Sequence, residues 1–308
     1  MSDDHVKHGW NLTRCDFLKA SGTVVCGLSL RSAGATESTA RLRFGILTDP
    51  HYADTAPKGS RHYRESVAKM AECIALMNEQ RVDFIVELGD FKDQNKPVSE
   101  ASSLENLKAI ESVFGRFKGP RYHVLGNHDA DSISKEQFLA NTENTGIEPG
   151  SKYYSFDSKG LHFIVLDPNY KADGSDYDHG NFHWKDTNIP DQEMAWLKND
   201  LAETTAPTIA FIHQPLDPRD ETLFIKNADQ VRQALQESKK VLAVFQGHLH
   251  KGNYSHIEGI HYYTLKAMVE GTGAANNSYA IVEVDHGGNI TVTGYSRAVC
   301  QTMNKAPA

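Results

Sequence analysis

The sequence predicts a layered α/β fold over residues 41–300, and three observations lead to this prediction. Short apolar runs alternate with helical patterns from Arg41 onward. Several runs are almost entirely apolar, which is typical of strands that are buried on both faces. The chain has 308 residues, of which 39% are hydrophobic, and this is enough to bury a large core.

The first 40 residues differ from the rest of the chain. The stretch 13–19, TRCDFLK, precedes a mildly apolar run at 20–30 and small residues that end at Ala35. A basic start, an apolar middle and an Ala-x-Ala end are typical of a removable export signal, and the run is shorter than a membrane span. The stretch resembles a twin-arginine signal, with Cys15 in place of the second arginine. We therefore expect residues 1–40 to be signal-like and the protein to be exported to the periplasm. A disordered tail on a cytoplasmic protein is the alternative.

The regular elements are predicted in chain order from their periodicity. Strands are expected at 42–47, 84–88, 122–125, 163–166, 209–212 and 241–245, and helices at 65–78, 104–117 and 191–201. Further strands are expected at 261–265, 279–284 and 290–295, with a hairpin turn at Gly287-Gly288-Asn289. We expect these last strands to form a second, more antiparallel sheet.

The stretch 167–190 has no clear periodicity and is too long for a simple connection. It is therefore a candidate substrate-facing loop. Tyr177, His179, His183 and Trp184 are candidates to line a nucleoside pocket by stacking, and ordinary packing within the loop is the alternative.

Residues of the types that bind metals follow five of the predicted strands. They are Asp49 and His51, then Asp90, then Asn127 and His128, then His213, and finally His248 and His250. Ligands of open α/β sheets collect at the carboxyl ends of strands, so these five segments are expected to meet in one crevice.

The types of these residues predict a centre of two divalent ions. Asp90 is the natural bridge, because a carboxylate can span both ions. Mixed carboxylate, imidazole and amide ligands suit Mn, Fe or Zn better than Mg or Ca. Two such ions activate a water and neutralise a phosphoryl group, which indicates a hydrolase of phosphate esters.

The charge of the chain argues against a nucleic-acid partner. The net charge is −8, and Lys and Arg do not form a block. Binding to a polyphosphate backbone needs clustered cations. We therefore expect a small-molecule phosphate ester or nucleotide as substrate, no nucleic acid, and no stable insertion into a membrane.

The order D-x-H, G-D, G-N-H-[DE], H and G-H-x-H resembles the pattern of the calcineurin-like metallophosphoesterase family. The resemblance implies a four-layer α/β/β/α sandwich of two mixed sheets. It also implies a role for each residue of the pattern. One ion would be held by Asp49, His51, Asp90 and His250, and the other by Asp90, Asn127, His213 and His248. His128 would donate a proton or steady the phosphate, with its ring oriented by Asp129.

A closer resemblance links residues 41–297 to the manganese-dependent ADP-ribose/CDP-alcohol diphosphatases. It is carried by Phe44-Gly45-Ile46, Tyr52-Ala53-Asp54, residues 61–66 (RHYRES) and Gly252-Asn253-Tyr254-Ser255. The chain departs from that branch at His51, where the branch commonly carries glutamine. The resemblance implies hydrolysis of a phosphodiester or pyrophosphate bond.

Further residues are expected near the substrate. Arg61 and Arg64 are candidates to clamp a second phosphate, and a solvated helix start is the alternative. Asn127 and His128 are also expected to contact the substrate, and Asp93 to support the metal ligands. Two other activities stay open, namely a phosphomonoesterase and a 3′,5′-cyclic-nucleotide phosphodiesterase. A non-catalytic metal-binding scaffold on the same fold is the third alternative.

Overall fold

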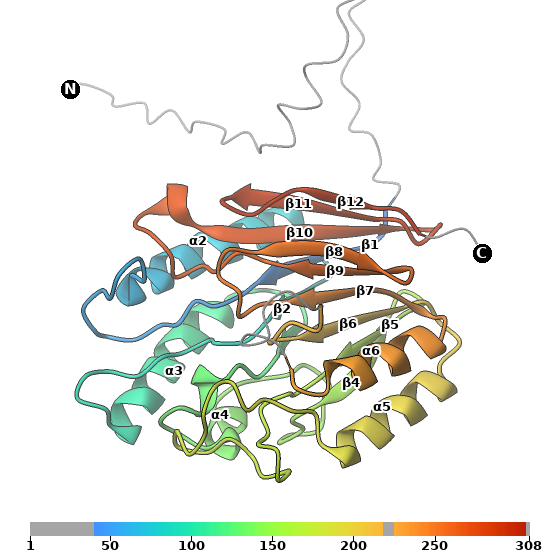
Figure 1. The fold of residues 1–308 in the computed structure, drawn as a ribbon. Coiled ribbons are helices and arrows are strands. Elements are labelled where there is room, and N and C mark those ends of the chain that lie inside the picture. The colour runs from blue at the N-terminus through green and yellow to red at the C-terminus, as the bar shows by residue number, and fades with distance from the viewer. Residues whose placement is uncertain (1–39, 218–224, 306–308) are drawn as a thin grey trace, which may run out of the picture.

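The computed structural model describes residues 40–217 and 225–305, which form two six-stranded sheets (Figure 1). In the first sheet β1, β2 and β3 are parallel, and the other neighbours pair antiparallel. Its strands, in spatial order, are β12 (Gln301–Met303), β11 (Ile290–Ser296), β10 (Ser278–Asp285), β1 (Ala40–Leu47), β2 (Phe84–Glu87) and β3 (Arg121–His123).

The second sheet is also mixed. Its central strands β5, β6, β7 and β9 run parallel, and an antiparallel strand pairs at each edge. In spatial order the strands are β4 (Tyr154–Ser158), β5 (Leu161–Val165), β6 (Thr208–Ile212), β7 (Val241–Gln246), β9 (Ile260–Thr264) and β8 (Asn253–Ile257).

The C-terminal strands do not form a sheet of their own, so that prediction is wrong. β9 extends the second sheet beside β7, whereas β10 pairs with β1 in the first sheet. The reason is that the second half of β1, from Phe44 to Leu47, is fully buried and needs a partner on its open side, which β10 supplies with Val282 opposite Phe44. The expected hairpin turn at 287–289 does join β10 to β11.

The two sheets pack face to face over an aromatic core. Phe44 from β1 stacks on Phe84 of β2 at 5.0 Å between ring centroids. Its edges meet Phe163, Phe211 and Phe245, which belong to the second sheet, at 5.7 to 5.8 Å. Such edge-to-face contacts add about 0.5–1.5 kcal/mol each to the burial of the rings. This core therefore fixes how the two sheets lie relative to each other.

Helices cover the outer face of each sheet (Figure 1). The first sheet shares an apolar cluster with α2 (Ser66–Gln80) and α3 (Glu100–Phe114), and the second with α5 (Asp191–Glu203) and α6 (Ala228–Glu237). A short helix, α4 (Lys135–Ala140), follows the single turn η2 (His128–Ala130). Two further turns are η1 (Tyr63–Glu65) and η3 (Ala274–Asn276). The order of layers is helix, sheet, sheet, helix, and the predicted four-layer sandwich is confirmed.

Two further expectations concern export and membrane insertion. The export signal falls at residues 1–40, almost all of which lie outside the described part, and it stays a prediction. Within residues 40–217 and 225–305, every helix is too short or too polar to cross a bilayer.

Candidate metal centre

The predicted ligands meet at one edge of the sandwich because they follow parallel strands. β1, β2 and β3 end at this edge in the first sheet, and β6 and β7 end there in the second. The centre therefore takes side chains from both sheets, and the prediction that five strand ends converge is confirmed.

The backbone bends sharply at these strand ends. Asp49, His51, Asp90 and His248 have φ values of 50°, 45°, 56° and 64°, in the left-handed region that non-glycine residues rarely adopt. Gly126 is needed for the close approach of two loops, because a Cβ there would lie 2.1 Å from the amide nitrogen of Asp90. Strained residues of this kind persist where the surrounding structure holds them, and they cluster at functional sites.

One group of ligand atoms comes from Asp49, His51 and His250. Their candidate ligand atoms lie within 4.8 Å of one another. Nε2 of His51 is 3.1 Å from Nε2 of His250, and these two nitrogens are 3.5 and 3.3 Å from Oδ1 of Asp49. All three nitrogen and oxygen atoms therefore face one small space.

A second group comes from Asp90, His213 and His248 and is equally compact. Nε2 of His213 is 3.1 Å from Oδ2 of Asp90. The same carboxylate oxygen is 3.4 Å from Nε2 of His51 in the first group. Asp90 therefore lies between the two groups, where a bridging ligand has to be.

The Nδ1 atoms of His51, His213 and His250 form hydrogen bonds on the side of the ring that faces away from the centre. Nδ1 of His213 contacts the carbonyl oxygen of Leu88 at 2.7 Å, and Nδ1 of His250 contacts Oε1 of Glu270 at 2.6 Å. Nδ1 of His51 contacts Asp93 at 3.2 Å, as expected for a supporting carboxylate. Such partners fix the tautomer and leave Nε2 as the lone-pair nitrogen that faces the centre.

Several polar atoms at the centre are buried without a hydrogen bond among the described residues. They are Oδ1 of Asp49, Oδ1 of Asn127, and Nε2 of His213 and His248. A buried polar atom without a partner costs about 1–3 kcal/mol. All of them are lone-pair donors of the kind that divalent cations take. The residues therefore fit two divalent metal ions.

The charge states also suit cation binding. Burial alone would raise the pKa of Asp49 and Asp90, but the neighbouring imidazoles hold both below their usual range. For His248, burial and the nearby His213 lower the pKa to about 3, so its ring is neutral. Ionised carboxylates and neutral imidazoles are the forms that bind metals. Despite burial, Asp90 raises the pKa of His213 to about 9, and Asp49 and Glu270 raise that of His250, so these two rings have to lose a proton when a metal binds.

His128 lies beside the centre, and its ring partner is not the predicted one. Nδ1 of His128 contacts Oδ2 of Asp131 at 3.1 Å and lies 3.5 Å from Asp93. The prediction that Asp129 orients this ring is wrong. The carboxylate of Asp129 accepts instead from four backbone amides of the loops after β2 and β3, at 2.8 to 3.2 Å. Asp129 therefore holds the Asp90 loop in place.

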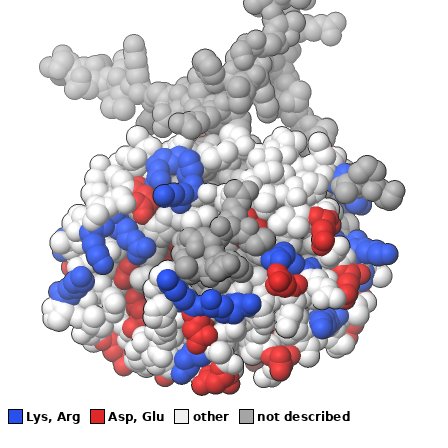
Figure 2. Space-filling model, in the orientation of Figure 1, with Lys and Arg blue, Asp and Glu red and all other residues white. Residues whose placement is uncertain are grey.

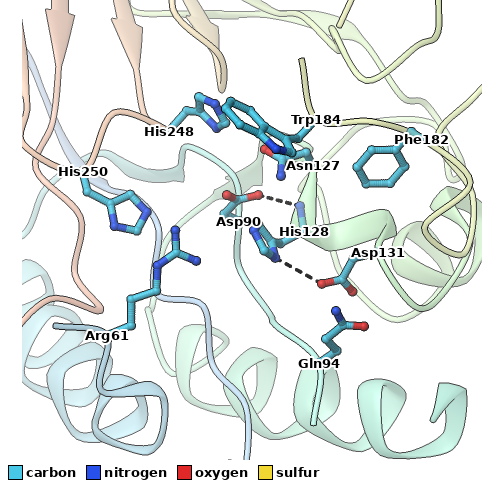
Figure 3. Close-up of a pocket in the computed structure, with 10 residues that line it drawn as sticks. All are labelled: Arg61, Asp90, Gln94, Asn127, His128, Asp131, Phe182, Trp184, His248 and His250. Atoms are coloured by element: carbon cyan, nitrogen blue, oxygen red, sulfur yellow. Dashed lines mark hydrogen bonds and ion pairs between the residues drawn. The ribbon is translucent and has the colours of Figure 1, made fainter. Parts of the chain in front are cut away.

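A cleft of about 350 Å³ opens over the centre (Figure 3). Arg61 and His250 lie on one side, and Trp184 and Phe182 on the other. Arg64 does not reach the cleft. It pairs with Asp54 at the surface, where its side chain is 58% exposed, so the solvated alternative holds for this residue.

The loop 167–190 contributes to the cleft as expected, but through different residues. Trp184 lines it, together with Phe182, which the sequence prediction omitted. Tyr177 is fully buried under Phe182, with parallel rings 3.7 Å apart. His179 pairs with Asp178 and is not among the lining residues.

Sequence reasoning also missed Gln94, Asp131 and Glu270. Asp131 had a usable signal, because it follows His128 at the i, i+3 spacing that brings side chains together on one turn. Glu270 and Gln94 had none. Both lie in loops whose course depends on contacts with distant parts of the chain.

On the face shown in Figure 2, basic and acidic side chains are interspersed. This distribution matches the absence of a Lys/Arg block in the sequence.

Comparison with known proteins adds four likenesses. The sequence profile described as calcineurin-like phosphoesterase matches residues 42–252. A manganese-dependent ADP-ribose/CDP-alcohol diphosphatase from Oryza sativa subsp. japonica is 27% identical over 74% of this chain and 83% of the relative. A glycerophosphodiester phosphodiesterase from Enterobacter lignolyticus is 20% identical over 65% of this chain and 69% of the relative. A dimetal phosphatase from Danio rerio has a similar fold, with a TM-score of 0.73 over 87% of this chain and 100% of its own, at 19% identity.

Proposed function

The chain belongs to the calcineurin-like phosphoesterase family, and we propose that it hydrolyses the pyrophosphate bond of small nucleotide substrates such as ADP-ribose and CDP-alcohols. The observation that carries this proposal is the pair of ligand groups joined by Asp90 beneath a cleft with one cationic and one aromatic side. The relatives named for that activity support the same substrate class.

The ligand assignment follows the two groups. Asp49, His51, Asp90 and His250 would hold one ion, and Asp90, Asn127, His213 and His248 the other. Mn, Fe or Zn suits this donor set. Bound there, two divalent ions supply an activated water and neutralise charge on the phosphoryl oxygens.

The chain's own groups act on the leaving group and on the second phosphate. Asp131 and Asp93 hold His128 through Nδ1, which leaves Nε2 to give a proton to the departing oxygen. The other oxygen of Asp131 pairs with the fully buried ammonium of Lys92, so this carboxylate is itself fixed. Arg61 is one-third exposed at the rim, where its fork-shaped guanidinium suits a second phosphate.

A direct test removes the metals with a chelator and then restores Mn²⁺. We expect hydrolysis of ADP-ribose to AMP and ribose 5-phosphate to disappear on chelation and return on reloading. The panel should include a CDP-alcohol, bis-(p-nitrophenyl) phosphate, a monoester, a cyclic nucleotide and a glycerophosphodiester. Absence of metal-dependent turnover on the whole panel would overturn the proposal.

The aromatic side of the cleft gives a second prediction. Trp184 is 38% exposed and ready to stack on a base, and stacking contributes about 1–3 kcal/mol per base. Trp184→Ala should therefore raise KM for ADP-ribose about 10-fold and leave KM for a diphosphate without a base nearly unchanged. Trp196→Phe, in the packing around α5, is the matched control. Equal changes in KM for both substrates would contradict a base-stacking role.

A phosphodiesterase is the second candidate function. His51 favours it, because the diphosphatase branch commonly carries glutamine at this position. The panel distinguishes the two candidates, since the second one predicts that the glycerophosphodiester or the cyclic nucleotide is the best substrate.

A further inference from the structure

Lys69 on α2 is a buried lysine surrounded by backbone carbonyl oxygens. Its Nζ donates to the carbonyls of Met268 at 2.8 Å, Glu270 at 3.0 Å and Gly271 at 2.8 Å, and a fourth carbonyl, that of Asn276, lies at 3.4 Å. The residue is 2% exposed. Burial lowers the pKa of Lys69 to about 8, so the ammonium is still mostly charged at neutral pH.

The four carbonyls belong to the segment 267–277, which follows β9 and runs past the metal centre. The amides of Met268 and Val269 donate to the carbonyls of Thr48 and Asp49, at 3.0 and 3.1 Å. On its other edge, the segment pairs with the chain around Ser60. The side chain of Asn277 donates back to the carbonyl of Lys69 at 2.9 Å, so α2 and the segment are joined in both directions.

The segment carries Glu270, the partner of His250. Oε1 of Glu270 contacts Nδ1 of His250 at 2.6 Å, and its backbone forms a bridge with Arg61. A hydrogen-bond partner behind a metal-binding histidine typically affects metal affinity by about 10–100-fold. The position of the segment therefore matters to one ligand and to the arginine at the rim of the cleft.

Proteins that bind a monovalent cation often replace its hydration shell with a ring of backbone carbonyl oxygens. Here an ammonium on a side chain occupies the centre of such a ring. Without a cation there, four carbonyl dipoles would face one another across a buried space, and the segment would lose its attachment to α2.

We propose that Lys69 serves as a built-in monovalent cation that holds the segment 267–277, and through Glu270 positions His250, so that the cage left by Lys69→Ala binds K⁺ or NH₄⁺. Lys69 is thus a positioning residue for the metal centre. The part that concerns metal affinity rests on the proposed function, whereas cation binding in the cage does not.

The test compares the wild-type chain with Lys69→Ala in salts of equal ionic strength. With the metals removed and in LiCl or tetramethylammonium chloride, we expect the variant to melt at least about 4 °C below the wild type. KCl or NH₄Cl should restore at least half of that loss, because only these ions match the size of the ammonium they replace. Mn²⁺ affinity, measured from the EPR signal of free Mn²⁺, should fall about 10–100-fold and recover in the same two salts.

Three variants serve as controls. Lys69→Met fills the cage with an apolar chain and should lose Mn²⁺ affinity without recovery in any salt. Glu270→Gln should lose Mn²⁺ affinity with no preference among the salts. Lys240→Ala removes a lysine that donates to a single carbonyl, that of Leu201, and should show no salt-specific recovery of Tm.

The outcomes distinguish cation binding in the cage from the effect of Lys69 on metal affinity. Recovery of Tm in K⁺ and NH₄⁺ alone supports the cage even if no substrate of the panel is hydrolysed. Recovery in all four salts, or wild-type Tm and Mn²⁺ affinity in Lys69→Ala, overturns it. Should Lys69→Ala be insoluble, wild-type Mn²⁺ affinity in Lys69→Met would overturn it as well.

Discussion

Asp90→Ala should release both metal ions and abolish hydrolysis while the protein stays folded. Its Oδ2 lies 3.1 Å from Nε2 of His213 and 3.4 Å from Nε2 of His51, so the carboxylate belongs to both ligand groups. No other described residue reaches both histidines with a carboxylate oxygen. We expect bound Mn to fall from about two ions per chain to well below one, and turnover to fall by at least about 10³-fold.

Elemental analysis after gel filtration measures the metal content, and circular dichroism checks the fold. The matched control is Asp200→Asn, which changes a carboxylate that bonds Ser155 and His162 away from the centre. It should retain both ions. Two ions per chain in Asp90→Ala would remove the bridging role.

His128→Ala should separate turnover from metal content. The ring contacts Asp131 and Asp93, and it is 28% exposed toward the cleft. Neither ring nitrogen of His128 is among the buried atoms that lack a hydrogen-bond partner at the centre. Loss of a proton donor typically costs about 10²–10⁴-fold in rate. We therefore expect kcat to fall within that range while the chain still binds two ions.

The leaving group provides a finer test of the same role. A phosphodiester that releases an alkoxide needs a proton in the transition state, whereas p-nitrophenolate leaves without one. His128→Ala should therefore slow the first substrate far more than the second. Equal losses for both substrates, or loss of metal in parallel with activity, would assign His128 to binding instead.

The strand ends could be predicted from the sequence because two simple features coincide there. The strands are recognisable as buried apolar runs, and each is followed within four residues by a polar residue such as Asp49, Asp90 or His213. Parallel strands in layered folds then bring these positions to one edge. This logic is local, and it located the residues of two of the three groups that could hold a metal. In the third group, Asp93 was expected only to support the ligands.

The prediction for the C-terminal strands failed because their placement depends on contacts between distant segments. Whether β10 joins the first or the second sheet is decided by its pairing with β1, some 240 residues away, and nothing within β10 encodes this choice. The choice of Asp129 over Asp131 was a local error, because the i, i+3 spacing on the η2 turn brings Asp131 to the ring of His128. α6 was missed because its buried face has few large apolar side chains.

The packing of Phe44 also concerns the metal centre. Phe44 touches aromatic rings of both sheets, and the metal centre takes one share of its donors from each. The packing around Phe44 therefore bears on how the ligands that follow β1, β2 and β3 lie relative to those that follow β6 and β7. We expect a substitution that changes the side-chain volume at Phe44 to alter catalysis although it changes no coordinating residue, because close-packed cores transmit such changes.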